Sequence, residues 1–166
     1  MKELSMIVAV GNNWELGLNN RLLCHLPEDM KWFKSKTSGH TVIMGDRTWE
    51  SLPQKPLPNR RNIVMTLDRS LVYPGCEMAY SIEELFDMLD DNENPFIIGG
   101  ATIYKLFIDK IQYLYLTRIL SNFEADAFFP TVDFSKWDLI SDEFFANDER
   151  NPYDLRFQYY QLKNKR

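Results

Sequence analysis

Short apolar runs of strand length alternate with helix-like segments along most of the chain, and this alternation is the strongest constraint on its fold. The strand-like runs lie at residues 6–10, 41–44, 62–66, 96–98 and 113–117. Short runs without regular polar alternation are typical of strands that are buried on both faces. Strands of this kind occur in parallel sheets covered by helices. The runs therefore predict a central sheet in which most strands are parallel.

Segments with helical patterns lie between these runs. Pro27–Thr37 begins with a proline, whose missing N–H costs nothing in the first turn of a helix. Shorter helices are expected at residues 45–52 and 101–107. Ser81 followed by Glu84 is a capping pattern and predicts one more helix.

The last part of the chain has a different pattern. Two aromatic, alternating segments at residues 138–145 and 155–163 flank a polar turn and predict an antiparallel hairpin. Strand–helix alternation followed by a hairpin indicates an α/β fold. We expect a single domain over residues 1–166, with a mostly parallel central sheet, a C-terminal antiparallel hairpin and flanking helices.

Charge, cysteine content and hydropathy narrow the class of protein. The net charge is -5 and the basic residues form no stripe, so a nucleic-acid partner is not expected. Cys24 and Cys76, taken with His25 and His40, have no metal-binding spacing, so no metal site is expected. No stretch approaches the roughly 20 apolar residues that span a membrane. We expect a cytoplasmic protein with free thiols and no membrane partner.

The helix at Pro27–Thr37 carries an acidic residue in a place where a ligand could use it. Asp29 lies in the first turn, at the edge of the face that Met30, Phe33 and Thr37 share. A lone carboxylate beside an apolar face is costly unless a group with matching donors binds it. The alternative is an ordinary first-turn acid that the helix dipole stabilises. The helical pattern leaves both interpretations open.

Two strand-to-helix junctions carry glycine where a bulky side chain would obstruct the backbone. One is Met44–Thr48, with Gly45, and the other contains Gly99–Gly100. Helix N-termini without obstructing side chains present N–H groups to anions such as phosphate, and ligands of α/β sheets bind beyond the carboxyl ends of strands. The alternative at each junction is a glycine that only allows a tight turn.

Two further segments could contact a ligand. Arg60 and Arg61 follow a proline-rich loop, and arginine can hold a carboxylate through two hydrogen bonds. The alternative is a solvated basic pair. Gly11–His25 is expected to be a long polar loop, which could be a lid over a site or an ordinary surface loop.

Taken together, these segments resemble the dihydrofolate reductase family over nearly the whole chain. The matching motifs occur in the family's order and are Ile7–Val10 for the first strand, Leu16–Asn20 for the mobile loop over the active site, Leu26–Asp29 with Phe33 for the catalytic helix, Met44–Gly45 with Thr48–Ser51 for the cofactor helix, Leu57–Arg60 for the folate-tail clamp, Ile98–Gly100 with Tyr104 for a double-glycine turn with a cis peptide, and then Tyr115–Thr117, Asp126 and Phe129–Pro130. The resemblance implies an NADPH-dependent oxidoreductase that reduces 7,8-dihydrofolate to 5,6,7,8-tetrahydrofolate in support of one-carbon metabolism. It also implies a monomer that binds folate-like inhibitors.

The same resemblance implies roles on the substrate side. Asp29 would bind the 2-amino group and N3 of the pterin ring, and Thr117 would hydrogen-bond Asp29; these two are the expected catalytic residues. Arg60 would bind the α-carboxylate of the glutamate tail. Hydride would pass to C6, and a water favoured by the charge of Asp29 would bring the proton to N5. The other expected substrate-binding residues are Ile7, Val8, Met30, Phe33, Leu52, Leu57 and Ile98.

On the cofactor side, backbone groups of Ala9 and Leu16 would hold the nicotinamide carboxamide, and the two glycine junctions would seat the diphosphate. The complete expected cofactor-binding set is Ala9, Leu16, Gly17, Leu18, Gly45, Asp46, Arg47, Thr48, Met65, Thr66, Arg69, Ile98, Gly99, Gly100, Ala101, Thr102, Ile103 and Tyr104.

The chain departs from the family pattern in two places. Leu23–Cys24 stands where the family usually has Pro-Trp, and Asp46 stands where a basic residue commonly follows Met-Gly. Two alternative functions remain: a related pyrimidinone reductase of riboflavin synthesis, which would not need Asp29 with Arg60, and a catalytically silent ligand-binding homologue. The complete set of Asp29, Phe33, Arg60 and Thr117 argues against the silent homologue.

Overall fold

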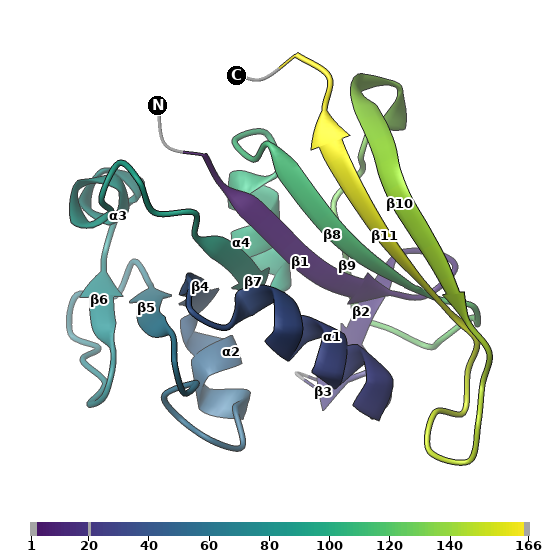
Figure 1. The fold of residues 1–166 in the computed structure, drawn as a ribbon. Coiled ribbons are helices and arrows are strands. Elements are labelled where there is room, and N and C mark those ends of the chain that lie inside the picture. The colour runs from purple at the N-terminus through teal and green to yellow at the C-terminus, as the bar shows by residue number, and fades with distance from the viewer. Residues whose placement is uncertain (1–2, 20, 165–166) are drawn as a thin grey trace.

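The computed structural model describes residues 3–19 and 21–164, so Asn20 of the Leu16–Asn20 motif lies outside the described residues. The strands of its main sheet are β1 (Ser5–Val10), β4 (Thr41–Gly45), β5 (Arg61–Met65), β6 (Glu77–Ala79), β7 (Phe96–Gly99), β8 (Tyr113–Ile119), β10 (Trp137–Phe145) and β11 (Leu155–Leu162). Their order across the sheet is β10-β11-β8-β1-β7-β4-β5-β6, which can be followed from right to left in Figure 1.

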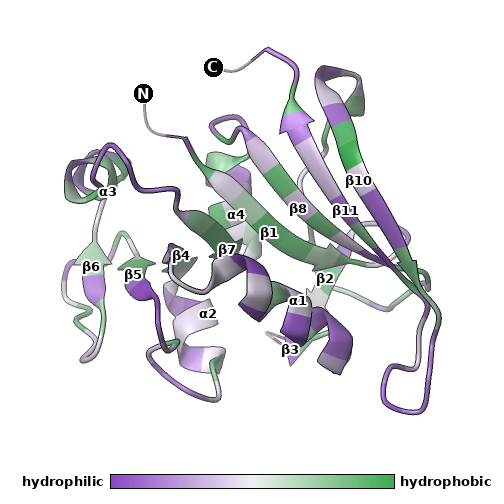
Figure 2. Ribbon diagram, viewed as in Figure 1, coloured by the Kyte–Doolittle hydropathy of each residue, from purple (hydrophilic) through white to green (hydrophobic). Residues whose placement is uncertain are grey.

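The sheet is mostly parallel, as predicted. Strands β8, β1, β7, β4, β5 and β6 pair in parallel. β11 pairs antiparallel with both β8 and β10, which confirms the C-terminal hairpin. The central strands carry the apolar runs and appear green in Figure 2.

Helices cover both faces of the sheet. They are α1 (Pro27–Thr37), α2 (Asp46–Ser51), α3 (Ile82–Met88) and α4 (Ala101–Phe107), and a short 3-10 helix follows at Phe134–Lys136. On one face, residues of α1 and α2 such as Phe33 and Trp49 pack around Ile7. On the other face, Leu85 of α3 and Phe107 of α4 belong to a cluster with Met6 and Val8. The side chains of Met6 and Val8 point away from the face that carries Ile7. This arrangement leaves the first turns of α1, α2 and α4 at the carboxyl ends of the parallel strands (Figure 1).

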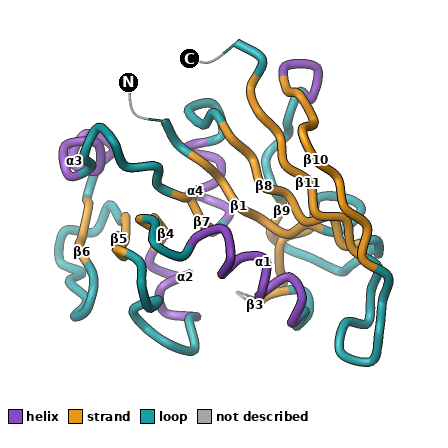
Figure 3. The backbone as a smooth tube through the Cα atoms, viewed as in Figure 1, coloured by secondary structure: helices purple, strands orange, loops and turns teal. Residues whose placement is uncertain are grey.

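The prediction of one long polar loop at Gly11–His25 is wrong in part. This segment contains β2 (Glu15–Leu18) and β3 (Arg21–Leu22), and β2 pairs with the distant β9 (Ala127–Phe128) to form a second, three-stranded sheet. Figure 3 shows these short strands between long loops. Strands of two to four residues are too short to show a period of their own, and it is the pairing across the fold that makes them strands.

Candidate active site

Asp29 and Thr117 meet where the first turn of α1 lies against β8. Thr117 Oγ1 donates a hydrogen bond of 2.7 Å to Asp29 Oδ1. Thr117 faces α1 because it is two residues along the strand from Tyr115, whose ring contacts Trp32 of that helix. Burial raises the pKa of the Asp29 carboxyl to about 6, although the hydrogen bond from Thr117 opposes this rise. The site therefore holds a carboxylate that takes up or releases a proton close to neutral pH.

Two other ionisable groups lie within the field of Asp29. Burial, and then the charge of Asp29, raise the pKa of the Cys24 thiol to about 11. Burial and Asp29 also raise the pKa of Tyr104. The Tyr104 hydroxyl lies 2.8 Å from the carbonyl oxygen of Ile7 and 2.9 Å from that of Ile98, so it ties α4 to β1 and β7. Of these three groups, only Asp29 is ionised at neutral pH.

The predicted apolar wall forms only in part. Five of its side chains belong to one cluster, and these are Ile7, Phe33, Leu52, Leu57 and Ile98. Met30, on the same helix as Phe33, is 50% exposed and does not join the cluster. The side chain of Val8 packs on the opposite face of the sheet, because neighbouring residues of a strand point to opposite faces. Val8 can therefore reach a ligand at this site only through its backbone.

Arg60 lies against α1 in a defined conformation. Its Nε donates to the carbonyl oxygen of Pro58 at 2.9 Å and its Nη1 donates to Thr37 Oγ1 at 3.0 Å. The guanidinium carbon lies 5.9 Å from the ring centroid of Phe33. Burial lowers the pKa of Arg60, but arginine keeps its charge in proteins. Among the described residues no carboxylate forms a salt bridge with Arg60, so its charge is available to an anionic ligand.

The neighbouring Arg61 has a different role. Its guanidinium donates to Glu77 at 2.6 Å and to Glu93 at 2.9 Å. These carboxylates raise the pKa of Arg61, and the main cause is the hydrogen bond that Arg61 donates to Glu77. The pair of arginines thus divides into a structural residue, Arg61, and a candidate ligand-binding residue, Arg60.

Gly45 and Gly99–Gly100 lie at the ends of the neighbouring strands β4 and β7, and the Gly99–Gly100 peptide is cis, as the resemblance implied. A Cβ atom on Gly45 would lie 3.0 Å from Ile103 Cγ1, and one on Gly99 would lie 3.3 Å from the Tyr104 hydroxyl. Gly45 and Gly100 are the N-cap residues of α2 and α4, and neither helix has a side-chain cap. Two helix N-termini with bare backbone therefore lie together, which suits a diphosphate group.

Several polar side chains of the predicted cofactor set already have protein partners. Thr66 Oγ1 donates to Asp46 Oδ2 at 3.1 Å. The Arg69 guanidinium is paired with the Glu84 carboxylate at 3.2 Å. Arg47, in the first turn of α2, is exposed and forms no salt bridge among the described residues. Of the two arginines in this set, Arg47 is therefore the one that no carboxylate of the described residues holds.

The other members of that set differ in what they can offer. Met65 and Ile103 are core side chains with 3% and 8% exposure, so only their backbone can reach a ligand. Thr48 and Ala101 are partly buried beside the glycine junctions, and Thr102 is exposed. A Cβ on Gly100 would lie 3.5 Å from Thr48 Oγ1, so the two helix N-termini nearly touch.

The predicted lid residues Leu16, Gly17 and Leu18 lie in β2, directly after the turn that leaves β1 near Ala9. The segment is held by Asp126, whose backbone N–H donates to Gly17 O at 3.0 Å. Its carboxylate also accepts from the Asn19 N–H at 3.1 Å. The lid is thus tied to the loop before β9.

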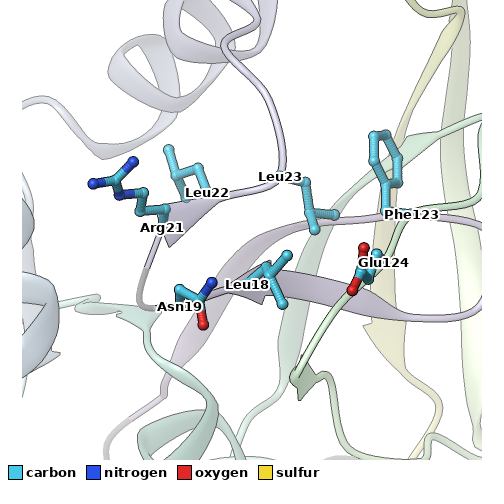
Figure 4. Close-up of a pocket in the computed structure, with 7 residues that line it drawn as sticks. All are labelled: Leu18, Asn19, Arg21, Leu22, Leu23, Phe123 and Glu124. Atoms are coloured by element: carbon cyan, nitrogen blue, oxygen red, sulfur yellow. The ribbon is translucent and has the colours of Figure 1, made fainter.

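An open hollow of about 510 Å³ lies beside the lid. Figure 4 shows that it lies between the lid segment and the loop before β9, and its lining residues are Leu18, Asn19, Arg21, Leu22, Leu23, Phe123 and Glu124. Neither Asp29 nor Arg60 lines it. The candidate site is therefore defined by the side-chain geometry described above and not by this hollow.

Some residues around the site were not predicted from the sequence. Trp32 packs between α1 and the sheet, with ring centroids 5.0 Å from Phe157 and 6.0 Å from Tyr115. The Asn151 side chain accepts a hydrogen bond from the backbone N–H of Glu28 at 3.0 Å. No local sequence signal connects Asn151, 123 residues away, to α1.

Within residues 3–19 and 21–164, no three His, Cys, Asp or Glu side chains are grouped so that they could hold a metal ion. In the same residues, no helix is both long and apolar enough to cross a membrane.

Comparison with known proteins gives one consistent result. A family model described as dihydrofolate reductase matches residues 3–162. The dihydrofolate reductase of Bacillus subtilis (strain 168) is 42% identical over 161 residues, which are 97% of this chain and 95% of the relative. That of Staphylococcus haemolyticus is 37% identical over 159 residues, 96% of this chain and 95% of the relative. A solved structure of dihydrofolate reductase from Enterococcus faecalis, complexed with NADP(H) and RAB-propyl, matches with a TM-score of 0.90 at 34% identity and covers 98% of this chain and 97% of that one.

Proposed function

The chain belongs to the dihydrofolate reductase family and reduces 7,8-dihydrofolate to 5,6,7,8-tetrahydrofolate with NADPH, and on this premise we propose that Asp29, held by Thr117, is its catalytic carboxylate. The observation that carries the proposal is the partly buried carboxylate, with one oxygen bound to Thr117 at 2.7 Å and a pKa that desolvation raises to about 6. The 2-amino group and N3 of a pterin ring are two parallel donors that match a carboxylate. The substrate thereby supplies the partner that a buried carboxylate needs.

The residues of the chain orient the substrate, exclude bulk water from it and place a negative charge beside it. NADPH, when bound, supplies the hydride that reduces the pterin at C6. Asp29 orients the ring, and its negative charge favours the arrival of a proton from water at N5. Ile7, Phe33 and Ile98 keep bulk water from the ring, which strengthens the effect of the charge.

The rest of the substrate contacts the chain along α1. Arg60, already oriented by Thr37 and Phe33, binds the α-carboxylate of the glutamate tail through two hydrogen bonds. Leu52 and Leu57 line the path between the ring and the tail. Met30 lies at the rim, where half of its surface is exposed.

The cofactor is held mainly by backbone. The N-termini of α2 and α4, at Gly45 and Gly100, bind the diphosphate, and Thr48 and Arg47 border it. Backbone groups of Ala9 and Leu16 hold the nicotinamide carboxamide. The bare glycine backbone, on which a Cβ would meet neighbouring atoms, is the feature of this chain that fits such a ligand.

We further infer that the enzyme is a single-domain monomer of the cytoplasm, without nucleic-acid or membrane partners. The net charge of -5 disfavours polyanionic partners. Sedimentation at micromolar protein concentration tests whether the protein is a monomer. A second species of twice the mass would contradict this oligomeric state. Folate-like inhibitors are expected to compete with dihydrofolate at Asp29.

Single-turnover hydride transfer in Asp29→Asn tests the proposal. We expect a decrease of about 10²-fold or more at pH 7, the scale of positioned acid–base effects, with partial recovery at low pH, where the substrate arrives protonated. Asp109→Asn is the matched control, because this side chain is 73% exposed and its ion-pair partner is the adjacent Lys110. A wild-type rate in Asp29→Asn would refute the role.

A further inference from the structure

The first turn of α1, which carries Asp29, receives its cap from the far end of the chain. Leu26 occupies the N-cap position and has no side-chain acceptor, and Pro27 has no N–H to donate. The N–H of Glu28 is the first orphan donor of the helix. It donates to Asn151 Oδ1 at 3.0 Å, across 123 residues of sequence.

Asn151 is built into the loop between β10 and β11, which Figure 3 shows as a long loop at the end of the hairpin. The residue is buried, with 3% exposure. Its Nδ2 and its backbone N–H donate to Asp148 Oδ1 at 3.0 and 2.8 Å. The Asp148 N–H donates back to Asn151 O at 2.9 Å. Because the ionised Asp148 only accepts, it takes the amide NH₂ of Asn151 and leaves the amide oxygen for α1.

The loop that presents Asn151 is braced independently of α1. Asp154 Oδ1 accepts from both the backbone N–H and the Nδ2 of Asn147, at 2.8 and 2.7 Å. The N–H of Leu120, at the end of the β8 region, donates to Asp154 O at 3.0 Å. The loop is therefore anchored next to the strand that carries Thr117, the hydrogen-bond partner of Asp29.

We propose that Asn151 is a positioning residue of the active site, which fixes the first turn of α1 and so aligns the Asp29 carboxylate with Thr117. The inference rests on the proposed function of Asp29. Glu28 and Asp29 are adjacent, so a displaced Glu28 N–H moves the backbone of Asp29. An amide suits this position because it caps the helix without adding a charge. A carboxylate would also cap it, but its charge would lie close to a buried carboxylate and to Asp148.

Removal of the cap is the first test. In Asn151→Ala we expect the affinity for a folate analogue and the rate of hydride transfer to fall about tenfold, within the range known for lost N-caps. NADPH affinity should stay within twofold, because the hydrogen bonds of Asn151 go to Glu28 and Asp148 and not to the glycine junctions. Glu149→Ala is the matched control: it truncates an exposed side chain in the same loop but leaves the bonds of Asn151 and the Asn147–Asp154 brace in place, and it should stay within twofold in all three measurements.

A second pair of variants covers the case in which Asn151→Ala does not fold. Asn151→Asp keeps an acceptor for Glu28 and adds a negative charge near Asp29, so the pH at which hydride transfer is half-maximal should rise. Ala146→Asp adds the same charge at an exposed position of the same loop, leaves the bonds of Asn151 and Asn147 in place, and should leave this pH unchanged. Equal profiles in the two variants would overturn the inference.

Asp29→Asn, measured in parallel, separates the two proposals. If Asp29→Asn is impaired while the Asn151 variants match the Glu149→Ala and Ala146→Asp controls, the positioning role alone is refuted. If Asp29→Asn retains the wild-type rate, both the proposed function and the positioning role are refuted.

Discussion

Replacement of Asp29 by asparagine should make the ligand-free protein more stable while it slows hydride transfer. Burial raises the pKa of the Asp29 carboxyl from its ordinary value of 3.8 to about 6. Each pKa unit corresponds to about 1.4 kcal/mol, so the ionised carboxylate lowers the free energy of unfolding at neutral pH by about 3 kcal/mol. Asparagine keeps the shape and an oxygen that accepts from Thr117, but it carries no charge. We therefore expect Asp29→Asn to be about 2–3 kcal/mol more stable at pH 8.

The pH dependence of this difference has a defined sign. Between pH 4 and 6 the folded protein holds the Asp29 proton more tightly than the unfolded chain does. The contribution of Asp29 to stability is therefore most favourable below pH 4 and is lost as the pH rises through about 6. The stability gained by Asp29→Asn should be near zero at pH 4 and reach its full value by about pH 7.

Urea unfolding of both proteins at several pH values, without ligands, measures the difference directly. Other carboxyls, such as Glu77 and Glu93, have lowered pKa values and stabilise the protein as the pH rises, but they act in both proteins and cancel in the difference. Asp109→Asn, with an exposed side chain, should show no such difference. An Asp29→Asn variant that is no more stable than wild type, or whose gain is the same at pH 4 and pH 8, would refute the argument from burial.

Three other predictions concern substrate, lid and cofactor. Arg60→Leu should weaken dihydrofolate binding by roughly 2–4 kcal/mol, the cost of a lost charge-assisted bidentate pair, but should barely affect a pterin without the glutamate; equal losses in titrations with the two ligands would mean that Arg60 acts through the fold. Cys24 should react more slowly with a thiol reagent in the ternary complex, because the lid is expected to order over the nicotinamide; labelling that ligands leave unchanged would count against this closure. Asp46 lies beside Thr66 and places a negative charge where the adenosine 2′-phosphate is expected, so Asp46→Arg should lower the Michaelis constant for NADPH and leave that for NADH nearly unchanged. A parallel shift for both cofactors would show that Asp46 does not face the phosphate.

The elements with a strong local signal could be predicted from the sequence. The helices at Pro27–Thr37 and Ala101–Phe107 have the predicted bounds, because a first-turn proline and a glycine junction are local signals that tertiary packing did not override. Five of the six parallel strands were marked by apolar runs, which need no knowledge of the partner strand. The short strands β2, β3, β6 and β9 were missed because each depends on a partner elsewhere in the chain.

The residues of the candidate site also fall into those that could be predicted from the sequence and those that could not. The position of Asp29 in a first turn and the glycines at two junctions follow from neighbouring residues, and the family resemblance supplied Thr117 and Arg60. By contrast, Val8 was assigned to the site although its side chain faces the other side of the sheet. The ion pair between Arg69 and Glu84 could not be predicted from the sequence either, because the charge of a residue does not show which opposite charge lies near it in the fold.

The sequence by itself determined which chemical groups this protein possesses and which of them lie at the ends of helices and strands, because these properties depend on residues a few positions apart. The tertiary structure alone decided how the groups act. Thr117 reaches Asp29 across 88 residues and Asn151 reaches Glu28 across 123, and both contacts depend on packing and strand register. The raised pKa of Asp29 likewise comes from burial, which is a property of the assembled fold and not of any segment of the chain.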